Sequence, residues 1–281
     1  MGILNKDIAL LLSKFPKGTS IGNVLTIGRL NNRIDKDFMQ RIGFHDEGCF
    51  YFDELLPKIW KARIVESLDV SSYQKSSIVH DLNFPIDDSL LNKYDLVIEG
   101  GSLEHIFNFP VALTNLVKML KPGGTLFMST MANNHCGHGF YQFSPELFFS
   151  VFSGESFKNL SIYLAPSYFP GAELFQKSFI YKVESPIKIK GRVGLRTNSP
   201  ITINVMVERT EKYFDEFESI IQSDYKIAHK NLYKENNFSK QNNLRLFFRG
   251  LKQIYTYSFF NKRFYKKSKL LDLLNENSDR L

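Results

Sequence analysis

The stretch 94–104, YDLVIEGGSLE, constrains the fold more than any other part of the sequence. Residues 96–98 form a short apolar run that ends at Glu99, and two glycines follow it. An apolar run of this length is typical of a strand that is buried on both faces of a parallel sheet. Because ligands of open α/β sheets bind beyond the carboxyl ends of the strands, the polar residues that follow Glu99 are the first candidates for a functional site.

Similar apolar runs alternate with helical patterns along the first 210 residues. We expect strands at 23–27, 63–69, 76–81, 94–99, 125–130, 159–165 and 201–209. We expect helices at 5–14, 35–42, 53–61, 109–120 and from residue 144 onward. This alternation predicts an α/β fold with a doubly wound, seven-stranded, mainly parallel sheet. A long insertion rich in Pro, Gly and Ser is expected at 166–200.

The charge of the chain is concentrated near its end. Residues 240–270 hold nine basic residues and no acidic one, so the net charge of +7 belongs to this segment and the remainder is slightly acidic. We predict an α/β domain over 1–210 and a helical, basic and aromatic extension over 211–281. Three interpretations of the basic segment stay open: a peripheral contact with an anionic membrane or a partner enzyme, a clamp on a phosphate backbone, or a solvated helix whose aromatic residues pack on the domain.

Acidic residues end the second and third expected strands. Asp69 is placed to accept hydrogen bonds from the two hydroxyls of a ribose, and Asp81 to accept one from an adenine amine. Gly28, after the first strand, lets the backbone approach a ligand. A second interpretation of both acids is structural, since Asp69 precedes two serines and Asp81 precedes Asn83, which is how a cap or a turn begins.

The chain resembles the class I S-adenosylmethionine-dependent methyltransferases between about residues 23 and 209. Four pieces carry the resemblance: VESLDVSS, SIVHDLNFPI, YDLVIEGGSLEHI and NLVKMLKPGGTLFMST. It implies a Rossmann-like sheet and S-adenosylmethionine as cofactor. The residues that it implies for cofactor binding are Gly28, Arg29, Asp69, Val70, Asp81, Leu82, Glu99, Gly100, Gly101 and Ser102. The first loop departs from the family pattern, because residues 26–32 hold one glycine and no acid, and Arg29 brings a positive charge near the expected sulfonium.

A further block, 133–149, resembles methyltransferase-like bacterial proteins associated with surface-polysaccharide synthesis. It suggests O-methylation of a sugar, of a nucleotide-linked sugar or of a phosphoryl or phosphoramidate precursor, and Arg29 would suit an anionic acceptor. The alternative is a protein of the same fold that binds a ligand or partner without catalysis. Methylation of a nucleic acid is the third and least favoured hypothesis. The amino-methylating signature with two prolines is absent after the fourth strand, which disfavours methylation of a base amine but leaves other acceptors open.

Two loops carry candidate catalytic side chains. Methyl transfer to a hydroxyl is helped by a base, and histidine titrates near neutral pH. We expect His138 first and then His135 as this base, with Glu104 and His105 as an alternative pair. His135, Cys136 and His138 also resemble metal ligands, but no fourth ligand has a recognisable spacing, and we expect no metal.

The two cysteines have no disulfide spacing, and no apolar run is long enough to span a membrane. We also see no signal peptide. The expectation is a cytoplasmic protein that is membrane-associated only if the basic segment binds a membrane.

Overall fold

The computed structural model describes residues 2–44, 48–167, 179–217, 219–225, 248, 251–252 and 262–275. The strands are β1 (Gly2–Ile3), β2 (Asn23–Ile27), β3 (Asn31–Asn32), β4 (Ile64–Asp69), β5 (Ile78–Val79), β6 (Tyr94–Glu99), β7 (Leu120–Met131), β8 (Phe157–Pro166), β9 (Phe179–Val183), β10 (Ile201–Arg209) and β11 (Tyr265–Lys269). The helices are α1 (Asn5–Lys14), α2 (Lys36–Arg41), α3 (Leu56–Trp60), α4 (Phe109–Met119), α5 (Pro145–Val151), α6 (Pro186–Ile189) and α9 (Leu270–Asn275). Short 3-10 helices are η1 (Phe52–Glu54), η2 (Asp88–Leu90) and η3 (Leu103–His105).

Nine of the strands form one mixed sheet in the order β11-β9-β8-β10-β7-β6-β2-β4-β5. The five strands from β7 to β5 are parallel to their neighbours. The other four, β10, β8, β9 and β11, pair antiparallel. The chain therefore folds as an α/β protein with a parallel core, and β2 and β6 lie side by side at its centre.

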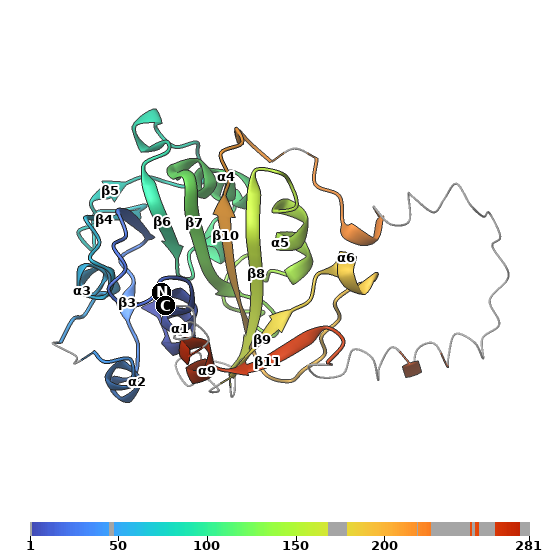
Figure 1. The fold of residues 1–281 in the computed structure, drawn as a ribbon. Helices are drawn as coiled ribbons and strands as arrows, with labels where there is room; N and C mark the ends of the chain where they lie inside the picture. The colour runs from blue at the N-terminus through green and yellow to red at the C-terminus, as the bar shows by residue number, and fades with distance from the viewer. Residues whose placement is uncertain are drawn as a thin grey trace.

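Helices cover both faces of this sheet (Figure 1). On one face, α4 and α5 pack against strand residues such as Val97 and Met128. On the other face, α1, α2, α3 and α9 pack against the alternate residues, among them Leu96 and Phe127. Each central strand thus buries both of its faces, which is why the strands lack the alternation of apolar and polar residues that a half-exposed strand shows.

The seven-stranded prediction is wrong in number, because β9 and β11 extend the sheet beyond β8. β9 lies inside the expected insertion, and β11 lies inside the basic segment that was expected to be helical. β11 is an edge strand, and its residues 266–269 include three lysines. It pairs with β9 through backbone hydrogen bonds, so it has no apolar pattern from which a strand could be predicted.

The C-terminal extension also differs from the prediction in one other described part. Residues 211–217 form no helix, and Phe214 and Phe217 instead pack on Phe157. Residues 270–275 do form a helix, α9, and its Leu270 and Leu273 are buried in the core that contains α1. The rest of the basic segment lies largely outside the described residues, so its three interpretations and the division at residue 210 stay predictions.

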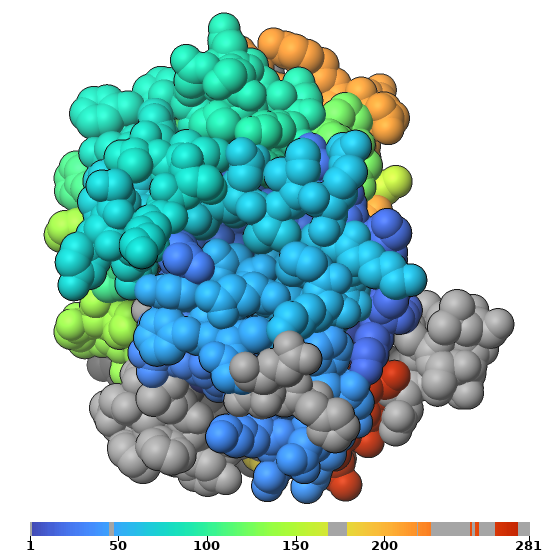
Figure 2. Space-filling model, turned by 90° about the vertical axis from the view of Figure 1, so that its left-hand side faces the viewer, coloured from blue at the N-terminus to red at the C-terminus, as the bar shows by residue number. Residues whose placement is uncertain are grey.

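The N-terminal third of the chain forms most of the surface at the β5 edge of the sheet (Figure 2). A stretch of helix long and apolar enough to cross a membrane does not occur in the described parts of the chain.

A buried polar network fastens α1 to the sheet. The ammonium of Lys6 lies 2.6 Å from a carboxylate oxygen of Asp7 and 2.7 Å from the hydroxyl of Ser129 on β7. The same Asp7 oxygen accepts a hydrogen bond of 2.6 Å from the side-chain amide of Asn204 on β10. Lys6 and Asp7 are almost fully buried, so each charge depends on the other for its solvation.

Removing Lys6 should therefore be costly. We expect Lys6→Ala to lower the free energy of unfolding by about 3 to 5 kcal/mol, because it leaves the Asp7 carboxylate buried and uncompensated. Urea denaturation measures this change, and Lys36→Ala, which removes an exposed lysine of α2, is the control. A loss of stability no larger than that of the control would contradict the account of the network.

Candidate active site

The turn after β6 is built around the side chain of Glu99. Its carboxylate oxygen Oε1 accepts hydrogen bonds from the backbone N–H groups of Gly101 at 2.7 Å, Leu103 at 3.2 Å and Ser102. Glu99 is fully buried. Burial and the nearby carboxylate of Glu104 raise the pKa of Glu99 to about 8, although the three N–H donors oppose the shift.

This turn places the side chain of Glu104 against β7. The Oε2 atom of Glu104 accepts a hydrogen bond of 2.6 Å from the hydroxyl of Thr130, the penultimate residue of β7. Its other oxygen, Oε1, is buried and has no hydrogen-bond partner among the described residues. The Nε2 atom of His138 lies 3.6 Å from this Oε1 atom. Glu104 is thus a buried carboxylate with one oxygen fixed and the other directed at a histidine.

The loop after β7 brings its histidines to the same place. The ring of His138 lies 5.2 Å from that of His105 and 5.9 Å from that of His135, measured between centroids. The backbone N–H groups of Phe140 and Tyr141 donate to the carbonyl oxygen of Glu104 at 2.8 and 3.2 Å. These bonds fix the loop against η3, so the four predicted catalytic residues form one cluster.

Of the two predicted nucleoside-binding acids, Asp69 ends its strand as expected, whereas Asp81 does not, because β5 stops at Val79. β4 ends at Asp69, and β5 runs parallel to it and precedes Asp81 by two residues. Both acids do accept hydrogen bonds within a local turn, as the structural interpretation predicted, but each uses only one carboxylate oxygen for this. Oδ1 of Asp69 accepts from the N–H of Ser71 at 3.3 Å, and Oδ1 of Asp81 accepts from the N–H and the side chain of Asn83 at 2.9 and 2.8 Å.

The second oxygens of these two acids are available to a ligand. In neither acid does Oδ2 take a hydrogen bond from the described residues, and both side chains are partly exposed. The hydrogen bonds from Asn83 lower the pKa of Asp81, which keeps that carboxylate ionised.

The other predicted cofactor contacts are placed less favourably. Leu82 is 4% exposed and belongs to the core, whereas Val70 is 66% exposed. Gly28 has a φ of 75°, a left-handed conformation that suits glycine at a tight turn. Gly100 is buried against Leu30, whose Cδ2 lies 2.9 Å from the place where a Cβ of Gly100 would stand. The side chain of Leu30 therefore fills the space beside Gly100 that a cofactor would need.

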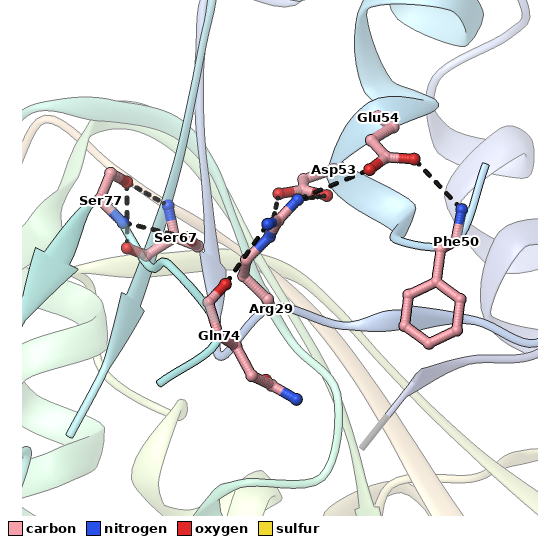
Figure 3. Close-up of polar contacts among 7 residues, drawn as sticks. All are labelled: Arg29, Phe50, Asp53, Glu54, Ser67, Gln74 and Ser77. Atoms are coloured by element: carbon pink, nitrogen blue, oxygen red, sulfur yellow. Dashed lines mark hydrogen bonds and ion pairs between the residues drawn. The ribbon is translucent and has the colours of Figure 1, made fainter. Parts of the chain in front are cut away.

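Arg29 is held by the protein itself (Figure 3). Its guanidinium lies 3.1 Å from a carboxylate oxygen of Asp53 and 3.6 Å from one of Glu54, and it donates to the carbonyl of Gln74 at 3.3 Å. It also stacks over the ring of Tyr51 at 3.8 Å. These contacts offset the positive charge of Arg29 that was expected near the sulfonium. They also occupy the N–H donors of Arg29 that an anionic acceptor would need.

A cavity of about 360 Å³ adjoins the histidine loop. It is lined by residues Ala132, Asn133, Gln142, Phe143, Ser144, Pro145, Leu164, Val193, Leu195 and Tyr265. Gln142 connects this cavity to the cluster, because its Oε1 atom accepts a hydrogen bond of 2.8 Å from the backbone N–H of His135. The cavity has the size of a binding site for a small molecule and combines apolar walls with amide and hydroxyl groups.

Several residues that support the candidate site were not predicted from the sequence. Thr130 and Gly139 support Glu104, and Tyr51, Asp53 and Glu54 hold Arg29. The position of Thr130 near the end of a buried strand was the only available signal. The other contacts join segments that are 22 or more residues apart.

The raised pKa of Glu99 predicts a dependence of stability on pH. The folded protein holds a proton on Glu99 more tightly than the unfolded chain does. This difference stabilises the folded state fully below the ordinary pKa of the carboxyl group, and the stabilisation is lost as the pH rises toward about 8. We expect the free energy of unfolding to fall by an amount on the order of a few kcal/mol between pH 5 and about 8.

The matched variant for this prediction is Glu99→Gln, which mimics the protonated group. It should flatten the fall measured by urea denaturation at a series of pH values. An unchanged pH slope in Glu99→Gln would show that another group causes the dependence.

No family model matches the chain, and no curated protein matches it. Solved structures with a similar course of the chain do exist. One is a protein from Bacillus halodurans C-125 provisionally named a methyltransferase (12% identity, TM-score 0.41, 73% of this chain and 99% of that one). Another is the N-methyltransferase NodS from Bradyrhizobium japonicum WM9 in complex with S-adenosyl-L-homocysteine (14%, TM-score 0.40, 73% and 86%).

A third is phosphoethanolamine N-methyltransferase 2 from Haemonchus contortus in complex with S-adenosyl-L-methionine (11%, TM-score 0.42, 74% and 53%). This chain spans about half the length of that protein. At these identities and TM-scores we assign no activity from the similarities, and the proposals below rest on the residues of this chain.

Proposed function

We propose that this protein is an S-adenosylmethionine-dependent methyltransferase that acts on a hydroxyl group of a small molecule. The observation that carries the proposal is the buried Glu104 carboxylate facing His138 at 3.6 Å, at the carboxyl ends of β6 and β7. In open α/β sheets this edge is where ligands bind. A base and its supporting carboxylate at this edge suit the removal of a proton from an acceptor hydroxyl.

The residues of β4 and β5 fit the nucleoside half of the cofactor. Asp69 ends β4 and Asp81 follows the adjacent parallel strand β5 by two residues, and each keeps one carboxylate oxygen that no described residue uses. S-adenosylmethionine, when bound, supplies a methyl group on a sulfonium sulfur. The ribose hydroxyls would donate to Asp69 and the adenine amine to Asp81.

The chemistry of the step assigns a role to the histidine cluster. The acceptor oxygen would take the methyl group from the bound cofactor, which would leave as S-adenosylhomocysteine, and the Nε2 atom of His138 would take the hydroxyl proton. The Glu104 carboxylate stabilises the imidazolium that forms, since it is buried and its Oε1 atom is directed at that ring. The cavity lined by Phe143 and Gln142 is the proposed place of the acceptor.

The finer proposal is that the acceptor is a sugar or a nucleotide-linked precursor of a surface polysaccharide. It rests on the resemblance of 133–149 alone. A phosphoryl or phosphoramidate acceptor loses the support that Arg29 offered, because its guanidinium is already paired with Asp53 and Glu54.

A second candidate function is binding without catalysis on the same fold. Leu30 packs over Gly100, and the Glu99 carboxylate is buried by its own turn, which leaves less room near the expected sulfonium than an open loop would. Methyl transfer separates the two candidates, because a protein that only binds S-adenosylhomocysteine would show no transfer to any acceptor.

The cofactor assignment predicts a loss of affinity on removal of Asp69. Isothermal titration with S-adenosylhomocysteine should show at least tenfold weaker binding by Asp69→Ala, about 1.4 kcal/mol or more. Asp69→Asn keeps an acceptor for the turn with Ser71 and should also bind more weakly, because it loses a charged acceptor. Asp88→Ala, which removes an exposed acid of η2, should bind normally. Wild-type affinity in Asp69→Asn and Asp69→Ala would refute the ribose contact.

The catalytic assignment predicts that His138→Ala abolishes methyl transfer while leaving the affinity for S-adenosylhomocysteine unchanged. The assay measures transfer of labelled methyl from S-adenosylmethionine to a panel of sugars, sugar phosphates and nucleotide-linked sugars. Cys136→Ser, which changes an exposed side chain of the same loop, is the control and should retain activity. Near-normal turnover by His138→Ala would remove this histidine from the mechanism.

A further inference from the structure

Three side chains with metal-binding atoms converge at the carboxyl ends of β6 and β7. One ligand atom from each of Glu104, His105 and His138 lies within 4.8 Å of the other two. The carboxylate is buried, and the two imidazole rings are exposed. Two imidazoles and one carboxylate form a donor set that binds divalent transition metals and leaves coordination positions open to another ligand.

A buried oxygen in this cluster lacks a partner. The Oε1 atom of Glu104 takes no hydrogen bond from the described residues, although Glu104 is 0% exposed. Buried carboxylate oxygens are almost always paired, because an unpaired one costs free energy. Since Thr130 already holds Oε2 at 2.6 Å, a group that satisfies Oε1 has to lie on the side of His138. A cation between the two atoms would fill that role.

The surroundings orient these ligands as metal sites require. The hydroxyl of Thr130 fixes the carboxylate, and the backbone bonds from Phe140 and Tyr141 to the Glu104 carbonyl fix the loop that carries His138. A Cβ at Gly139 would stand 2.7 Å from that carbonyl oxygen, so only glycine lets the loop come this close. Outer partners of this kind hold metal ligands in place and typically account for a 10- to 100-fold effect on affinity.

The distances allow a common cation with small side-chain movements. Two donors on one tetrahedral zinc ion lie about 3.3 Å apart, given bonds of about 2.0 Å. Nε2 of His138 and Oε1 of Glu104 lie 3.6 Å apart, which is close to this value. The exposed His105 and His138 rings can rotate to close the remaining gaps.

We propose that Glu104, His105 and His138 bind a divalent transition-metal cation at the edge of the sheet. The two imidazoles favour Zn²⁺ or Co²⁺ over Mg²⁺, which prefers oxygen ligands. An open position of the cation would take the acceptor hydroxyl and lower its pKa. This last step rests on the proposed function, and in it the cation replaces His138 as the group that promotes loss of the proton, which passes to water. The set differs from the His135, Cys136 and His138 set suggested by the sequence: His105 and Glu104, from the other loop, take the places of His135 and Cys136.

The test is a titration of tag-free, chelator-treated full-length protein with Co²⁺, followed by calorimetry and by visible absorption. We expect one Co²⁺ per chain, competition by Zn²⁺ and no comparable binding of Mg²⁺. His105→Ala changes an exposed side chain, so it should fold, and it should bind Co²⁺ at least tenfold more weakly. Cys136→Ser should bind as the wild type does.

Three outcomes would overturn the site: no binding of Co²⁺ or Zn²⁺ by the wild type, wild-type affinity in His105→Ala, or loss of binding in Cys136→Ser. A parallel titration with S-adenosylhomocysteine separates this proposal from the proposed function. Metal binding without nucleoside binding would keep the cation site and remove methyl transfer. Nucleoside binding without metal binding would do the reverse and return His138 to the role of base.

Discussion

The conformation of the active-site edge depends on the buried carboxylate of Glu99. Its Oε1 atom accepts the three N–H groups that would otherwise be left without partners where β6 ends inside the protein. The turn that these bonds define delivers Glu104 to Thr130 on the neighbouring strand. Two carboxylates are thereby buried near each other, and the resulting repulsion adds to the burial that raises the pKa of Glu99. The arrangement costs stability, and carboxyl groups whose pKa is shifted in this way are candidates for functional residues.

The same edge of the sheet divides into two regions with different electrostatics. At β4 and β5, partly exposed acids keep free oxygens, and Asn83 lowers the pKa of Asp81. At β6 and β7, the buried acid Glu104 lies beside His105 and His138. Arg29 lies in the loop after β2 and is offset by Asp53 and Glu54, so it adds little positive charge to either region. A ligand with a polar nucleoside at one end and a cationic or metal-bound reacting group at the other would match this division.

Most of the parallel core could be predicted from the sequence. Helix 5–14 and strands 23–27 and 201–209 were predicted at their observed bounds, because each has a strong apolar pattern and clear turn residues beside it. β11 could not be predicted in the same way, since this edge strand, YKKSK, is held by backbone hydrogen bonds and buries few side chains. β9, FIYKV, does carry apolar residues, but it was included in the expected insertion.

The candidate site divides along similar lines. His138, His105 and Glu104 could be named from the sequence because they follow apolar strands, but their convergence could not, since the two loops are 33 residues apart. The pairing of Arg29 with Asp53 across 24 residues was equally hidden. Side-chain contacts between loops depend on the register and packing of the elements that carry them, and a local pattern contains neither.

The central claim is that Asp69, at the end of β4, and Asp81, just after β5, bind a nucleoside at the carboxyl edge of the sheet. A crystal structure of the protein grown with S-adenosylhomocysteine tests it most directly. The account predicts ribose hydroxyls on the carboxylate of Asp69, adenine beside Asp81, and the sulfur directed toward Glu104 and His138. A nucleoside bound elsewhere, or a rim without bound ligand at saturating concentration, would contradict it.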